Sequence, residues 1–314
     1  MISRRLIRIK TLQILYAFSK KKEVSSTNAE KELFHSVDKY YDLYHLLILL
    51  IVEMVELEIR NNDFKRRKKV PTADDLNPDL GLQDSLLVEK LNNNIELDNY
   101  LEKRKLSWKI HNDFIKQLYS DFTKSQIYTE FVEIKEKSFK DDKELIVRFY
   151  SEFLVENERF IDFLEEENIY WNDDYSFVLV MVIKTIRNFN SSSNKNMKLL
   201  PLFKNDGDHE FAKLLLRKTI VNKSEYIKII EKHTKNWDTE RIAQIDLLIL
   251  QLAIAEVLEF ESIPVKVSLN EYIEISKYYS TSRSKTFING LLDKIVKSLK
   301  EDKRIIKTGR GLIE

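Results

Sequence analysis

Three stretches of this sequence decide the fold that it predicts: residues 237–246 read WDTERIAQID, residues 263–271 read IPVKVSLNE, and residues 287–294 read FINGLLDK. Apolar residues around the first stretch step by three or four positions, which places them on one face of a helix: Ile242, Ile245, Ile249 and Leu252. Pro264 ends that helix, and Ser268 with Glu271 predicts a capping box that starts the next one. Ser284 is expected to begin the last helix. The three stretches therefore predict consecutive helices joined by short turns.

The rest of the chain predicts the same class of structure. The 314 residues include only 5 Gly and 4 Pro, and long segments of Leu, Ile, Lys and Glu run without turn residues. We predict an all-α fold whose length is ample for a buried core. Helices are expected over residues 3–19, 27–59, 107–137, 141–164, 172–190, 208–234 and 239–258.

Composition excludes several classes of protein. There is no cysteine, so disulfides and thiolate chemistry are absent. The longest apolar run, residues 46–52, is much shorter than the roughly 20 residues that cross a bilayer, and no apolar signal-peptide region is visible. We therefore expect a cytoplasmic location. Because the net charge is only +1, nucleic-acid binding would have to come from a local basic patch.

The predicted helices over residues 208–234 and 239–258 form a helical hairpin, and an earlier stretch of the sequence resembles it. A shift of 66 positions aligns Trp171 with Trp237, and it also pairs Asp142 with Asp208 and most apolar positions with apolar ones. We interpret this as a possible duplication of a helical hairpin, with coincidence between two amphipathic hairpins as the open alternative.

Arginine gathers at the beginning of the first predicted helix. Arg4, Arg5 and Arg8 fall within an arc of about 100° on a helix, so their side chains leave it on one side. Arginine forms bidentate hydrogen bonds with phosphate and stacks on bases, which suits single-stranded RNA. Taken alone, such a cluster is more often a solvated helix start.

Two groups of residues together resemble the NusB transcription antitermination family. The first is Arg4-Arg5-Leu6-Ile7-Arg8 followed by Gln13-Ile14-Leu15-Tyr16-Ala17, which is similar to the family's opening helix. The second is the C-terminal block quoted above, which is similar to the family's last three helices. The resemblance covers about residues 1–60 and 208–300.

The resemblance implies a NusB-like pair of helical bundles with an extra inserted helical region. We divide the chain into an N-terminal part with the arginine-rich helix (1–60), a helical insertion (61–207), a C-terminal bundle (208–300) and a tail (301–314). It also implies binding of boxA-like single-stranded RNA with the small-subunit ribosomal protein NusE, within the transcription elongation complex during rRNA transcription. A homodimer is possible.

Matching positions supply the expected sites. The resemblance implies RNA contacts by Arg4, Arg5, Arg8, Gln13, Phe287 and Asn289, and contacts towards NusE by Tyr16, Glu240 and Asp246. Leu247 and Gln251 stand where many relatives carry basic residues, so part of the basic surface is expected to have moved. Lys285 and Lys294 are the nearer candidates to replace it, and the run Lys65–Lys69 is a further one, although such a run is more often a solvated loop.

Catalysis is not predicted. The five histidines show no metal-ligand spacing, there is no Gly-rich phosphate loop, and no metal or cofactor is expected. The main alternative is a helical interaction scaffold or dimerisation module without RNA binding of its own. An RNA-modifying enzyme is a third alternative, but it would need a cofactor pocket that the glycines do not supply.

Overall fold

A computed structural model describes residues 1–19, 25–76, 81–234 and 242–312, with the side chains of residues 74 and 282 left aside. Every regular element in these ranges is helical, which confirms the all-α prediction. The chain forms two compact units: unit 1 comprises Met1–Val37 with Leu202–Glu314, and unit 2 comprises Asp38–Pro201.

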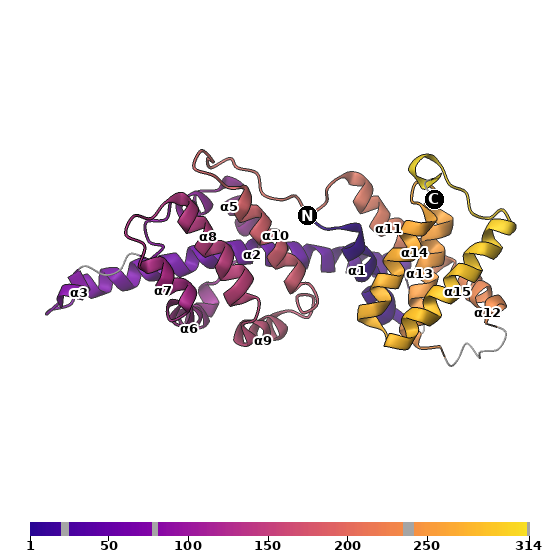
Figure 1. Ribbon diagram of the computed structural model, residues 1–314, viewed down its shortest axis with the longest axis horizontal. Helices are drawn as coiled ribbons and strands as arrows, with labels where there is room; N and C mark the ends of the chain where they lie inside the picture. The colour runs from indigo at the N-terminus through magenta and orange to yellow at the C-terminus, as the bar shows by residue number, and fades with distance from the viewer. Residues whose placement is uncertain (20–24, 77–80, 235–241, 313–314) are drawn as a thin grey trace. The chain divides into compact units, whose positions relative to one another are not determined.

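Unit 1 is built around one apolar helix. Its elements, labelled in Figure 1, are α1 (Arg4–Ser19), the start of α2 (Ser26–Arg66), α11 (Asp206–Val221), α12 (Lys223–His233), α13 (Gln244–Glu259), α14 (Val265–Tyr279) and α15 (Ser282–Glu301). Helix α13 is buried on nearly every side because α1, α11, α12, α14 and α15 all pack on it. Burying one Leu or Ile side chain contributes about 1.5–3 kcal/mol, so this helix is the centre of the core.

Unit 2 packs its helices along the remainder of α2. They are α3 (Ala73–Leu76), α4 (Leu86–Asn92), α5 (Ile95–Arg104), η1 (Lys109–His111), α6 (Asn112–Thr123), α7 (Gln126–Val132), α8 (Phe139–Arg148), the π-helical η2 (Phe149–Leu154), α9 (Glu158–Glu167) and α10 (Tyr175–Asn188). Three aromatic side chains donate hydrogen bonds to main-chain oxygens of α2: Trp108 to Leu46, Tyr150 to Leu47 and Trp171 to Lys39, at 2.6–2.9 Å. Large rings are therefore held in fixed positions against the helix.

Several expected helices are divided by capping residues. Ser125 accepts a hydrogen bond from the Tyr128 amide and starts α7 inside the stretch 107–137. Asn157 caps α9 in the same way inside 141–164. The stretch 208–234 breaks at Asn222, where α11 ends. At Ser125 and Asn157 a capping side chain replaces the main-chain partners that the first turn lacks, so these two breaks need neither Gly nor Pro; the Asn222 side chain makes no such cap to α12.

Two predicted helix starts are wrong. Helix α14 begins at Val265, directly after Pro264, and Ser268 lies buried inside it rather than capping it. Proline restricts the residue before it to extended conformations, and a following residue can begin a helix. The last helix begins at Ser282, because Thr281 accepts the Ser284 amide.

The helix lengths are in line with the possible duplication. Helices α8 and η2 together span residues 139–154. Adding 66 to these numbers gives 205–220, which nearly coincides with the range of α11, 206–221. The same shift moves α9 to 224–233 and α10 to 241–254, near α12 and α13. Similar lengths do not establish a common backbone, so the duplication remains a hypothesis.

Candidate functional site

The arginines at the start of α1 are half-exposed at two positions. The Arg4 Nε donates to Asp208 of α11 at 2.9 Å, and its guanidinium lies 5.1 Å from the centre of the Phe211 ring. Arg5 forms a bidentate pair with Glu271 of α14, with both N···O distances at 2.8 Å. The two side chains are 43% and 46% exposed, so each keeps an open side towards solvent.

Arg8 is buried and lies against two carboxylates. Its Nε and Nη2 donate to the two carboxylate oxygens of Glu256 at 2.7 and 2.6 Å, and its Nη1 lies 3.6 Å from Glu271. Ser268 and Tyr272 also donate to Glu256, at 2.8 and 3.0 Å. Burial alone would lower the pKa of Arg8, but its bonds to Glu256 raise it, so the residue stays charged. In this arrangement Arg8 has no free face for phosphate.

Charges from α1 and α15 meet around Glu274 on α14. The pKa of Glu274 is lowered first by its hydrogen bond to Lys277, and then by the positive charges of Lys277, Arg5 and Lys285. A charge acts on a carboxylate in this way only when it is nearby. Arg5 is bonded to Glu271 of α14, and α15, which bears Lys285, packs on the same helix, so these two residues that are 280 positions apart in sequence both lie near α14. We call Arg4, Arg5 and Lys285 the basic surface of unit 1.

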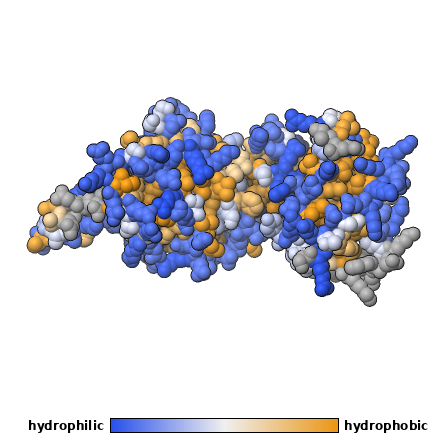
Figure 2. Space-filling model, in the orientation of Figure 1, coloured by the Kyte–Doolittle hydropathy of each residue, from blue (hydrophilic) through white to orange (hydrophobic). Residues whose placement is uncertain are grey.

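The other expected RNA-contacting residues lie on α15 and α1. Lys285, Asn289 and Lys294 are exposed on α15, and Phe287 is half-buried. Gln13 is half-buried on α1. Figure 2 shows hydrophilic side chains over much of the visible face of each unit, with apolar ones between them. Exposure makes these α15 residues available to a ligand, and their contact with RNA stays a prediction.

The three residues expected to lie towards NusE differ in their surroundings. Tyr16 is 45% exposed on α1. Asp246 is buried near the start of α13 and accepts a hydrogen bond from Ser280, just after α14. Glu240 lies outside the described residues. Of Tyr16 and Asp246, Tyr16 is therefore the residue whose side chain a partner could contact directly. All three roles remain predictions.

Sequence reasoning missed the carboxylates that pair with the arginines. Glu256 was not singled out, although a glutamate inside the apolar run of α13 is an available signal of a buried partner. Asp208 was noted only for its place in the possible repeat, and Glu271 only as a cap. Because partner choice depends on how α1 meets α11, α13 and α14, local spacing could not identify it.

The basic run Lys65–Lys69 belongs to unit 2 and is exposed throughout. Two of its members form ion pairs, Arg66 with Asp63 at 3.8 Å and Lys68 with Asp75 at 2.7 Å. Among the residues that the structure describes, no group of three or more acidic or histidine side chains is placed to hold a metal ion. Nor is any helix within those ranges both long and apolar enough to cross a bilayer.

Comparisons with known proteins converge on one family. The family model described as "NusB family" matches residues 179–297. The transcription antitermination protein NusB of Salinibacter ruber is 48% identical over 114 residues, which are 36% of this chain and 71% of that protein. The protein of the same name from Chloroherpeton thalassium is 40% identical over 33% of this chain and 50% of its own length. That of Natranaerobius thermophilus is 37% identical over 30% and 68%. No solved structure matches the chain.

Proposed function

The chain belongs to the NusB family of transcription antitermination proteins, and on that premise we propose that it binds boxA-like single-stranded RNA together with the ribosomal protein NusE. The observation that carries the proposal is the basic surface of unit 1, where Arg4, Arg5 and Lys285 remain exposed. A protein with a net charge near zero needs such a local patch to attract a polyanion.

RNA would be captured by exchange of ion pairs. The pair Arg5–Glu271 is partly exposed to solvent, and a pair of this kind stabilises a protein by only about 0–1 kcal/mol. A phosphate can therefore replace the carboxylate on Arg5 at small cost and gain bidentate hydrogen bonds, whereas Arg4 would meet phosphate on its open side and keep its bond to the buried Asp208. Asn289 and Phe287 on the neighbouring α15 would add a polar contact and a stacking contact.

Arg8 has a different part in this proposal. Its pair with Glu256 holds α1 onto α13, so that the exposed arginines leave the helix in a fixed direction. Breaking a buried pair leaves an uncompensated charge, which makes Arg8 a costly residue to release for RNA. We therefore assign it to positioning rather than to direct contact.

The remaining assignments follow from the family. We propose that Tyr16, Glu240 and Asp246 lie towards NusE and that the protein acts without enzymatic activity of its own within the elongation complex. We also keep residues 61–207 as the proposed insertion. The boundaries between the two compact units fall after residues 37 and 201. They mark where this chain packs on itself, whereas the bounds of the insertion are set by comparison with shorter relatives.

A binding titration tests the proposal. The full chain is titrated with a labelled boxA-like RNA in the presence and absence of NusE, with a scrambled RNA as the control. We expect NusE to increase the affinity for the boxA-like RNA more than for the scrambled one. Absence of boxA-like RNA binding under both conditions would refute the proposed function.

A further inference from the structure

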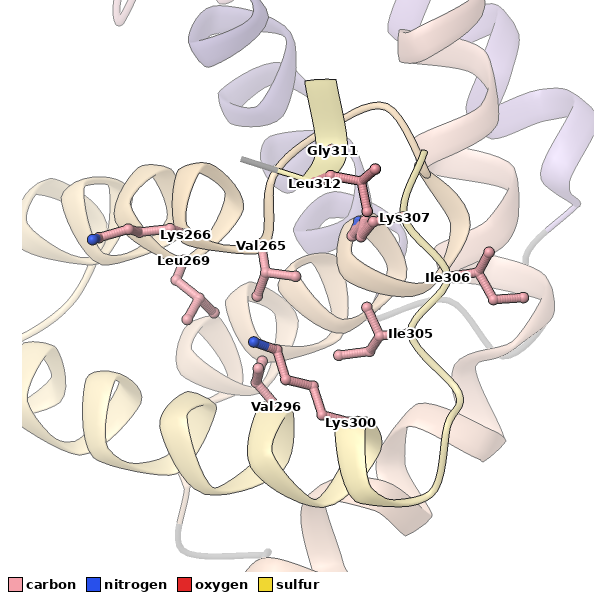
Figure 3. Close-up of a pocket in the computed structure, with 10 residues that line it drawn as sticks. All are labelled: Val265, Lys266, Leu269, Val296, Lys300, Ile305, Ile306, Lys307, Gly311 and Leu312. Atoms are coloured by element: carbon pink, nitrogen blue, oxygen red, sulfur yellow. The ribbon is translucent and has the colours of Figure 1, made fainter. Parts of the chain in front are cut away.

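A groove in unit 1 has no part in the proposed function. It lies between the start of α14, the second half of α15 and the segment 305–312, and it encloses about 700 Å³ (Figure 3). Val265, Leu269, Val296 and Ile305 form its apolar walls, and their side chains converge in the close-up. Hollows of this size suit a ligand of several apolar groups.

One wall of the groove is fixed in place by close main-chain contacts. The Thr308 amide donates to the Glu261 main-chain oxygen at 3.0 Å, and the Lys307 ammonium donates to that of Phe260 at 2.8 Å. A Cβ atom added to Gly311 would lie 1.8 Å from the Glu261 oxygen, so only glycine allows this approach. The segment therefore forms a defined wall rather than a loose cover.

The charge of the groove has one sign. Its lining includes Lys266, Lys300 and Lys307 and no acidic residue. Lys266 and Lys300 are exposed and form no ion pair with any residue in the described ranges. Figure 3 shows the Lys300 ammonium directed towards Val265, over the hollow. Burial lowers the pKa of Lys307, and the charges of Glu256 and Glu261 behind the groove wall act in the opposite direction.

These features favour a peptide over a nucleic acid. The apolar side chains that line the groove are aliphatic, and none of the lining residues is aromatic, so bases would find no ring to stack on. Two of the walls come from adjacent helices, with Val265 and Leu269 on α14 and Val296 and Lys300 on α15 each spaced by four residues. Grooves between helices bind the apolar face of a further helix through contacts at this spacing.

We propose that this groove binds a short acidic amphipathic helix of a partner protein. Its apolar side chains would pack on Val265, Leu269 and Val296. Its Asp and Glu side chains would pair with Lys266 and Lys300 at the edges. The charge pairs set the identity and orientation of the partner, while the apolar contacts are buried. This site is additional to the basic surface and does not depend on RNA binding.

The test uses a designed peptide of about four helical turns, with Leu on one face and Glu on the other, and a matched peptide in which Gln replaces each Glu. Binding to the full chain is followed by fluorescence anisotropy. We expect the acidic peptide to bind and Lys300→Glu to weaken it about tenfold, which corresponds to 1.4 kcal/mol. The control is Lys297→Glu, an exposed residue of α15 that does not line the groove and should change binding less than twofold.

Methyl NMR of Val265 and Val296 gives a second readout, because a ligand in the groove shifts their signals. Four results would overturn the proposal: no binding of the acidic peptide, equal binding of the Gln peptide, equal loss in Lys297→Glu, or unchanged methyl signals on binding. Displacement of the peptide by single-stranded RNA, with the same dependence on Lys300, would also overturn it, since the groove would then be a nucleic-acid site.

Discussion

Each unit buries a glutamate on a central helix, and the two are held in opposite ways. Glu256 of unit 1 receives a guanidinium and two hydroxyl groups. From the described residues, Glu58 of unit 2 receives hydrogen bonds from the Leu82 amide and the Tyr128 hydroxyl, at 3.2 and 3.3 Å, and no ion pair. Burial is the main cause that raises the pKa of Glu58, to about 7. A buried carboxylate in a close ion pair ties distant helices together, whereas Glu58, which has the charge of Lys137 in its surroundings but no ion pair among the described residues, becomes sensitive to pH.

The largest expected loss of stability follows from removing Arg8, the cation that distinguishes the site of Glu256 from that of Glu58. Arg8→Met leaves Glu256 buried without its cation, and we expect the free energy of unfolding to fall by about 3–5 kcal/mol. Arg5→Met, which removes an exposed pair, should cost about 1 kcal/mol or less. Urea denaturation followed by circular dichroism measures both. Equal losses for the two variants would contradict the assignment of Arg8 to the core.

The double variant Arg8→Met/Glu256→Met refines that result. Replacing both members of a buried pair by apolar side chains removes the uncompensated charge, so part of the stability should return. Recovery is expected to be incomplete because Ser268 and Tyr272 lose their acceptor.

Glu58 should make unit 2 less stable as pH rises. Its pKa is about 7 in the folded chain against an ordinary value of 4.5, so the folded state holds a proton that the unfolded state releases between these values. The stabilisation is full below pH 4.5, falls as pH rises to about 7, and amounts to about 3 kcal/mol at most. Hydrogen exchange across unit 2 should show this slope in the native chain and lose it in Glu58→Gln. An unchanged slope in Glu58→Gln would remove Glu58 as the cause.

The surroundings of Glu58 depend on a glycine. A Cβ atom at Gly81 would lie 1.9 Å from the Tyr128 hydroxyl oxygen and 2.4 Å from a Glu58 oxygen. Gly81→Ala should therefore destabilise unit 2 by about 1–3 kcal/mol, measured by denaturation. Gly290→Ala is the matched control: nothing lies within 4 Å of its Cβ, and alanine in a helix is favoured by about 0.5–1 kcal/mol. Equal effects at the two glycines would contradict the close approach.

The smallest expected effect concerns the exposed arginine. Glu271→Gln removes the charge that competes with phosphate for Arg5, so RNA affinity should rise about threefold, in keeping with a surface pair of up to about 1 kcal/mol. Glu225→Gln, which removes a carboxylate paired with Arg304, is the control. Filter binding at fixed salt measures both variants. Weaker binding by Glu271→Gln would show that this carboxylate supports the RNA surface rather than competing for it.

Sequence alone could predict the helical class and the elements that bear the family motif, because apolar periodicity and motif residues are local properties. It placed Arg4, Arg5 and Arg8 on one side of α1. Around the helix axis Arg8 points between Arg4 and Arg5, but it lies one turn further along the helix. The sequence could not predict that α13 and α14 would cover it there. Helix breaks at Ser125 and Asn157 were missed because neither residue is flanked by Gly or Pro, and a Ser or Asn can lie within a helix as well as cap one.

The central claim is that Arg4, Arg5 and Lys285 capture RNA while Arg8 holds the helix that presents them. The most direct test is the salt dependence of boxA-like RNA affinity in Arg5→Gln/Lys285→Gln and in Arg8→Met/Glu256→Met. Each lost phosphate contact lowers the slope of log affinity against log salt by about 0.7 for single strands, so the first variant should lose about 1.4. The second should keep the slope of the native chain. An unchanged slope in the first variant, or a reduced slope in a folded second variant, would contradict the account.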